Sequence, residues 1–230
     1  MKKQNFSIYL LFLISIFLVI ATGCKKDEHD NNNPANTFID PRDGTVYKFV
    51  TIGTQTWMAE NLRYLPGVAG PGTGSLTTPY YYVYLYYGTD VNAAKKTENF
   101  KTYGVLYNWT AAMSACPAGW HLPGDEEWAE LADYLGGLSV AGSKLKESGT
   151  THWADPNTGT NETGFTALPG GGRFLNGTFN YSVTFGNWWI ATEKNADQAW
   201  QHYAGHQSDY LFRYYASKGV GYSVRCVKDD

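Results

Sequence analysis

Three cysteines are the residues of this 230-residue chain with the clearest potential for covalent chemistry: Cys24, Cys116 and Cys226. Cys24 directly follows an apolar stretch and is a candidate for lipid attachment. If Cys24 is acylated, two thiols remain, and a pair of thiols in an oxidising compartment favours one disulfide. A Cys116–Cys226 bridge would close a long loop, worth roughly 4 to 5 kcal/mol in the chain-entropy model. The alternative is that these two cysteines bind a metal or act as nucleophiles.

The histidines and carboxylates give weaker signals for a metal site. The five histidines show neither HxH nor HExxH spacing. His202 and His206 would share one face only in a helix, whereas the aromatic residues around them favour a strand. Oxygen side chains of Asp155 and Asn157 could coordinate calcium, and the alternative is an Asx-rich turn. We therefore expect no metal and no cofactor.

The first 23 residues have the pattern of a signal peptide. Lys2 and Lys3 form a short basic region, and residues 8–20 are almost continuously apolar. This run is too short to span a bilayer, which takes about 20 residues. Residues 21–23 are small, and with Cys24 they resemble a lipoprotein signal-peptidase site. We expect acylated Cys24 to bind the chain to the lipid bilayer, with ordinary cleavage and a free Cys24 as the alternative.

Residues 24–37 are predicted to be a disordered tether, because this stretch is mostly polar, and residues 38–230 a single domain. Lysines followed by acidic residues just after Cys24 resemble the surface-export signal of Bacteroidetes lipoproteins. This pattern predicts an outer-membrane lipoprotein facing the cell surface, with a periplasm-facing anchor as the alternative. Removing residues 1–23 takes away Lys2 and Lys3 and changes the net charge from −3 to −5. No nucleic-acid partner is expected from such a charge.

Composition and turn signals favour a β-rich α+β domain. Aromatic residues make up 16% of the chain and charged residues only 17%, which suits short strands better than a helical bundle. Residues 45–52 and 56–62 are predicted to form a hairpin across Gly53-Thr54. Asn176-Gly177 predicts a second hairpin with a two-residue type I′ turn.

Two short helices are expected between the early and the late strands. The first follows a cap at Asn108 and has apolar residues at helical spacing up to Cys116. The second follows Gly124 and has Trp128 on its apolar face. Residues 80–87 are mostly tyrosine and predict either a strand packed on both faces or an exposed ribbon. Four late strands are expected, at residues 188–190, 199–203, 210–215 and 222–227.

Seven ordered blocks are distributed along most of the predicted domain: WMAENL at 57–62, YGVLYNW at 103–109, CPAGWHLP at 116–123, EW at 127–128, GFTALPGG at 164–171, WWIATE at 188–193 and SVRCV at 223–227. Together they resemble the Fibrobacter succinogenes major paralogous domain. The resemblance implies a C-type-lectin-like fold related to the formylglycine-generating enzymes. It also implies a secreted or lipid-anchored protein of unknown ligand.

The related enzymes act through a pair of cysteines near the C-terminal end of their domain. Here Cys226 is the one cysteine in that region, and a disulfide sulfur is neither a thiolate nucleophile nor a copper ligand. Asp155-Pro156-Asn157 is a carboxylate-Pro-Asn triplet like that of calcium-dependent lectins, but it precedes the 164–171 block instead of lying in the long ligand loop. We therefore expect a protein that catalyses no reaction.

Candidate ligand contacts lie in the late strands, where tyrosine and short polar residues give a composition typical of binding surfaces. Because successive strand residues face opposite sides, one of Trp188 and Trp189 is expected at the surface. The candidates are Trp189, His202, Tyr210, Arg213, Tyr214 and Tyr215. This predicts a surface recognition or adhesion module with an unknown protein or glycan ligand. The alternatives are a structural subunit of a surface appendage or outer-membrane complex, with residues 80–87 as an intersubunit edge, and an enzyme of the formylglycine-generating type.

Overall fold

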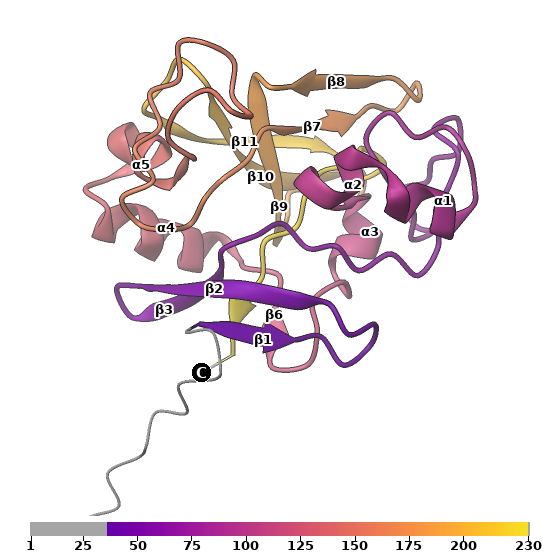
Figure 1. Ribbon diagram of the computed structural model, residues 1–230, viewed down its shortest axis with the longest axis horizontal. Helices are drawn as coiled ribbons and strands as arrows, with labels where there is room; N and C mark the ends of the chain where they lie inside the picture. The colour runs from indigo at the N-terminus through magenta and orange to yellow at the C-terminus, as the bar shows by residue number, and fades with distance from the viewer. Residues whose placement is uncertain (1–35, 230) are drawn as a thin grey trace, which may run out of the picture. The chain divides into compact units, whose positions relative to one another are not determined.

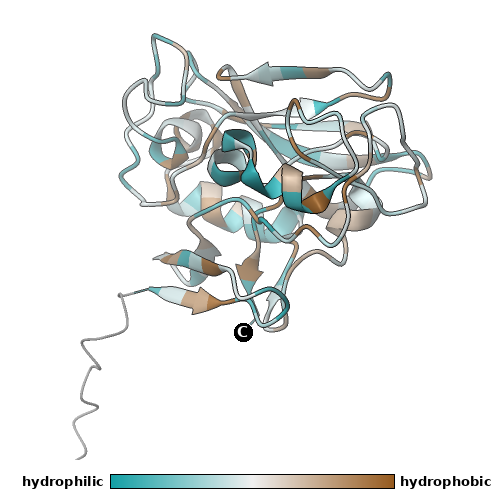
Figure 2. Cartoon of the chain, turned by 45° about the vertical axis from the view of Figure 1, so that its right-hand side comes forward, coloured by the Kyte–Doolittle hydropathy of each residue, from teal (hydrophilic) through white to brown (hydrophobic). Residues whose placement is uncertain are grey.

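A computed structural model of the chain describes residues 36–229 (Figure 1). The predicted signal peptide, Cys24 and most of the predicted tether lie outside the described residues. Within residues 36–229, no helix has the length and apolar character needed to cross a bilayer, and hydrophobic residues are spread over many short elements (Figure 2). A few helices combine with many short antiparallel strands and one disulfide, so the α+β class is confirmed.

The two ends of the domain meet in one antiparallel sheet of order β1-β2-β3-β12-β6. Its strands are β1 (Thr37–Ile39), β2 (Val46–Ile52), β3 (Gln55–Met58), β6 (Trp120–His121) and β12 (Val227–Lys228). The predicted hairpin across Gly53-Thr54 is confirmed, with Ile52 paired to Gln55. Gly53 has a φ of +63°, and a side chain there would press on the ring of Tyr134. Glycine is therefore the residue that fits this turn.

A second sheet, of order β11-β10-β9, contains the longest strands. They are β9 (Phe185–Glu193), β10 (Gln198–Gly205) and β11 (Leu211–Ser217). Three of the four predicted late strands are thus confirmed, whereas residues 222–226 form only isolated bridges before β12. Helices α4 (Asp125–Tyr134) and α5 (Leu138–Leu145) pack on one face of this sheet, where Trp128 and Leu145 join Trp188 in one hydrophobic cluster.

The described residues contain five helices, where the sequence predicted two. The predicted ones are α4 and α3 (Trp109–Ala112), which begins after the Asn108 cap but ends well before Cys116. The unpredicted ones are α1 (Val91–Lys96), α2 (Glu98–Tyr103) and α5. Helices α1 and α2 are too short to show periodicity, and the side chains of Asp90 and Thr97 cap their first turns.

The prediction of a continuous strand or exposed ribbon at residues 80–87 is wrong. Only Tyr81–Tyr82 form a strand, β4, which pairs with β5 (Leu106–Tyr107). Tyr82 and Val83 are fully buried, and the Tyr82 hydroxyl donates to the carbonyl of Thr73 at 2.7 Å. Tyr82 and Tyr84 bend into the domain, whereas Leu85 and Tyr87 are 50% and 66% exposed.

The second predicted hairpin exists, but its turn type was predicted wrongly. Strands β7 (Gly170–Arg173) and β8 (Phe179–Ser182) flank a loop in which Phe174 N–H donates to Thr178 O at 2.8 Å. Residues 175–177 therefore form a three-residue loop. Within it only Gly177 has a positive φ, +83°, whereas a type I′ turn needs two such residues. A side chain at Gly177 would also collide with the backbone of Pro71.

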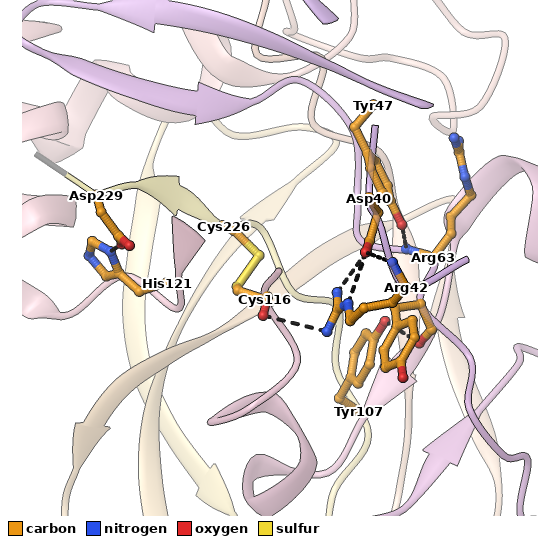
Figure 3. Close-up of a disulfide and its surroundings, with 10 residues drawn as sticks. Asp40, Arg42, Tyr47, Arg63, Tyr107, Cys116, His121, Cys226 and Asp229 are labelled. Atoms are coloured by element: carbon orange, nitrogen blue, oxygen red, sulfur yellow. Dashed lines mark hydrogen bonds and ion pairs between the residues drawn. A yellow bond between two sulfur atoms is a disulfide. The ribbon is translucent and has the colours of Figure 1, made fainter. Parts of the chain in front are cut away.

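The disulfide between Cys116 and Cys226 is confirmed, with Cα atoms 6.0 Å apart (Figure 3). It ties the segment after α3 to the residue just before β12. The guanidinium of Arg42 donates to the carbonyl of Cys116 at 3.5 Å and pairs with Asp40 at 2.7 Å. The bridge joins residues 110 positions apart, so by loop length it is worth roughly 4 to 5 kcal/mol.

Three fully buried cations form no ion pair within residues 36–229: Lys146, Arg173 and Arg225. The Lys146 ammonium donates at 2.7–3.0 Å to carbonyls of a single turn, those of Gly205, His206 and Ser208. The Arg173 guanidinium donates to carbonyls of two loops, those of Pro71, Thr73 and Gly219. Carbonyl dipoles thus replace the lost hydration of each charge, and each cation fixes loops that have no regular structure of their own.

Candidate ligand-binding groove

A groove of about 420 Å³ lies over the face of the β9–β11 sheet that is turned away from α4. His202 of β10 points to the helix side, where its ring stacks on Trp128 of α4 with centroids 4.9 Å apart. Successive strand residues face opposite sides, so Gln201 and Tyr203 face the groove. The β7–β8 hairpin lies beside this sheet and forms one wall (Figure 1).

Aromatic side chains form the walls of the groove. Phe174, Tyr181, Phe185 and Tyr203 make consecutive edge-to-face contacts, with centroids 5.4, 5.3 and 5.9 Å apart. Such contacts hold each ring in a defined orientation. Tyr181 remains 51% exposed and Tyr214 54% exposed, which leaves aromatic surface free for a ligand.

Two amide side chains lie at the floor of the groove. Gln201 is 3% exposed, and its Oε1 has no hydrogen-bond partner within the described residues. Asn187 is also buried, and its Nδ2 donates to the carbonyl of Gly171 at 3.2 Å. A buried oxygen without a donor costs about 1–3 kcal/mol, so Gln201 is a candidate acceptor for a ligand. No Asp, Glu, Lys, Arg or His lines the groove.

Two of the six predicted ligand contacts, Tyr214 and Tyr215, line the groove. The predicted contacts Trp189 and His202 do not line the groove: Trp189 is buried in the core, and His202 stacks on Trp128 on the helix side of the sheet. Trp188 is buried as well, so neither tryptophan reaches the surface. The sheet is covered on both faces at this point: α4 packs on one, and on the other Trp189 donates to the carbonyl of Tyr107 at 2.8 Å.

Tyr210 and Arg213 are exposed but lie outside the groove. Arg213 donates to both carboxylate oxygens of Asp125, at 2.7 and 2.6 Å. These hydrogen bonds lower the pKa of Asp125. The guanidinium also lies 3.5 Å from the ring centroid of Trp200. The positive charge of Arg213 is therefore paired within the domain, with Asp125 in the first turn of α4.

Most of the groove was not identified from the sequence. The residues missed are Phe174, Tyr181, Phe185, Asn187, Gln201, Tyr203, Ala216, Val220 and Tyr222. The one available signal was the Asn176-Gly177 turn, because it predicts a hairpin whose aromatic side chains could form one wall of a groove. Gln201 gave no signal, because a glutamine between Trp200 and His202 is equally typical of a solvated strand position.

Residues 36–229 contain no group of three or more His, Cys, Asp or Glu side chains arranged to hold a metal ion. His202 and His206 do not share a helix, since His202 belongs to β10 and His206 follows that strand. Asn157 forms an Asx turn, in which its Oδ1 accepts from Gly159 N–H at 3.0 Å. Its Nδ2 donates to the carbonyl of Glu147 at 2.7 Å. Both the oxygen and the nitrogen of the Asn157 amide therefore have hydrogen-bond partners, as the Asx-turn interpretation of this loop predicts.

Three of the seven sequence blocks meet at the side-chain oxygen of Asn61. Asn61 Oδ1 accepts from Arg225 and from Trp188 Nε1, each at 2.9 Å. A family model described as the Fibrobacter succinogenes major domain matches residues 50–228. The chain belongs to this family. No curated protein and no solved structure matches it. In this member of the Fibrobacter succinogenes major domain family, the blocks build the scaffold, whereas Gln201 and Tyr214 lie between them.

The burial of His202 predicts acid-sensitive stability. Desolvation lowers the pKa of His202 to about 4, against 6.5 in an exposed histidine. Between pH 6.5 and 4 the unfolded chain therefore binds a proton that the folded chain does not. The free energy of unfolding falls as the pH drops through this window, by up to about 3 kcal/mol. His202→Phe should remove this component, measured by chemical denaturation at pH 7 and pH 4.5.

The matched control is His206→Phe, which removes a histidine that is only partly buried. This control should keep the pH dependence of the wild-type chain. Equal pH dependence in the wild type and His202→Phe would contradict a neutral, buried His202.

Proposed function

We propose that the chain is a recognition or adhesion module that binds a ligand in the groove and catalyses no reaction. One observation carries the proposal: aromatic walls without any charged lining surround the unpartnered Oε1 of Gln201. Ligand sites are typically concave and mostly apolar, with a few placed polar groups. Rings already held by edge-to-face contacts lose little freedom when a ligand binds.

The state of the cysteines supports binding over catalysis. Cys116 and Cys226 are joined, so no thiolate is available within residues 36–229 for chemistry of the formylglycine-generating type. The structural-subunit alternative depended on residues 80–87 as an exposed strand edge. Burial of Tyr82 and Val83 removes that support.

We also propose that the domain has a C-type-lectin-like fold. Strands β1, β2, β3 and β12 bring both ends of the domain into one sheet, and the disulfide links the segment after α3 to the last strand. On this scaffold the β9–β11 sheet offers its open face to a ligand. A rigid, disulfide-linked sheet that supports an accessible sheet face suits a binding protein.

The proposed location is the outer membrane, with acylated Cys24 as the anchor and the domain facing the cell surface. The support comes from residues 1–23, which have a signal-peptide pattern, and from the small residues directly before Cys24. A polar tether would place the groove away from the lipid headgroups.

Cys24→Ser is expected to abolish lipid attachment, because no other residue of the predicted cleavage site carries a thiol. The measurement is incorporation of labelled palmitate into the full chain expressed in a Gram-negative host. Cys116→Ser is the control, since it removes a thiol and should leave the label in place. An unlabelled wild-type chain would contradict the anchor.

Tyr214→Ala is expected to weaken ligand binding by roughly tenfold or more, the usual cost of truncating an aromatic residue that carries binding energy. The full chain in detergent would be applied to arrays of glycans and extracellular-matrix proteins. Tyr134→Ala is the matched control, because Tyr134 is 66% exposed on α4 and lines no part of the groove. Equal loss of signal in both variants, or in neither, would contradict the groove as the site.

A further inference from the structure

We infer that the groove binds an uncharged sugar ring, with a ring hydroxyl donating a hydrogen bond to Gln201. This inference rests on the proposed function and names the ligand class for the same site. Three observations carry it: the absence of charge in the lining, the unpartnered acceptor at the floor, and the exposed rings at the rim.

The absence of cationic side chains selects against anionic ligands. A carboxylate or sulfate group entering the groove would lose hydration without meeting an opposite charge. Two lysines near β11 have other partners. Lys194 lies over the ring of Tyr215, and Lys218 is buried and paired with Glu193. A neutral ligand avoids this desolvation cost.

The floor demands a hydrogen-bond donor from the ligand. Gln201 Oε1 is inaccessible and unpartnered in the free protein, and Tyr214 is its direct neighbour across the β10–β11 ladder. In this proposal, displacement of the half-exposed Tyr214 ring, which stacks on Tyr215, opens the amide to a ligand. A purely apolar ligand, such as an acyl chain or an aliphatic side chain, would leave the oxygen unpaired. A hydroxyl group satisfies it.

The rim demands an apolar face on the same ligand. A pyranose ring has such a face, made of axial C–H groups, and can lie flat on an exposed tyrosine ring while its equatorial hydroxyls point sideways. Tyr181 and Tyr214, each about half exposed, offer two such rings. The volume of about 420 Å³ suits a short saccharide.

A protein partner is the less suitable occupant. Extended peptides usually pair with a sheet edge through main-chain hydrogen bonds, whereas this groove lies on a sheet face. No lining residue carries a charge that could form an ion pair with a peptide terminus or a charged side chain. A ligand with hydroxyl donors and an apolar ring face matches both requirements of the groove.

The test is isothermal titration of the full chain in detergent with neutral and charged oligosaccharides. The neutral probes are cellotetraose, xylotetraose and mannotetraose, and the charged probe is tetragalacturonate. We expect saturable binding of at least one neutral probe, unchanged by EDTA and by 50 to 500 mM NaCl. Tetragalacturonate should not bind.

Two variants locate the contact. Gln201→Leu removes the acceptor and should weaken binding roughly tenfold, as should Tyr181→Ala, which removes a stacking surface. Gln207→Leu makes the same substitution at an exposed turn and should leave affinity unchanged. Thermal unfolding of each variant checks that the fold is intact.

The outcomes separate this inference from the proposed function. Binding of tetragalacturonate alone, binding abolished by EDTA, or affinity equal in Gln201→Leu and Gln207→Leu would overturn the sugar inference. If no neutral probe binds but fibronectin or collagen binding depends on Tyr214, the sugar inference fails and the recognition module stands. If no probe of either class depends on Tyr214, both fail.

Discussion

The buried guanidinium of Arg225 is the interaction on which the rest of the domain depends. It donates to Asn61 Oδ1 and to main-chain carbonyls in two distant segments, those of Met58, Phe165 and Thr166. These bonds join segments separated by up to 167 residues, and the adjacent Cys226 adds a covalent link. Burial lowers the pKa of Arg225 to about 9, and taking such a charge out of water costs several kcal/mol unless hydrogen bonds replace hydration. The carbonyls of Met58, Phe165 and Thr166 and the Asn61 oxygen supply that replacement at the two Nη atoms, whereas Nε has no partner within the described residues.

Two further buried cations bind main-chain carbonyls in the same way. Lys146 fixes the turn that follows β10, and Arg173, which ends β7, fixes the loop at residues 71–73. Both cations bind carbonyls and not carboxylates. Short strands and irregular loops can then keep a defined geometry although they share few ladder hydrogen bonds. The aromatic walls are attached to parts of the chain that these cations hold, while the groove itself remains uncharged. This separation explains how a loop-rich domain can hold the walls of the groove in place.

Local signals in the sequence were sufficient for the elements that depend on local physics. The acidic first turn of α4, the Gly53-Thr54 turn and the even number of remaining cysteines each led to a feature that the structure contains. Prediction failed where contacts between distant segments decide whether a helix forms or a side chain is buried. Helix α5 contains a glycine and a β-branched residue and is held by packing against β11. Trp189 was placed at the surface because strand alternation cannot reveal that both faces of a sheet are covered. Gln201 was missed for the same reason, since its burial arises only when the β7–β8 hairpin and β11 assemble around it.

Hydrogen–deuterium exchange of the full chain, compared between the wild type and Arg225→Lys, tests the central role of Arg225 most directly. Lysine keeps the positive charge but lacks the planar fork that reaches several carbonyls at once. In Arg225→Lys we expect the amides around Met58, Phe165 and Trp188 to lose protection together, although they are far apart in the chain. Loss of protection confined to the residues next to position 225, with the other two segments exchanging as in the wild type, would contradict it.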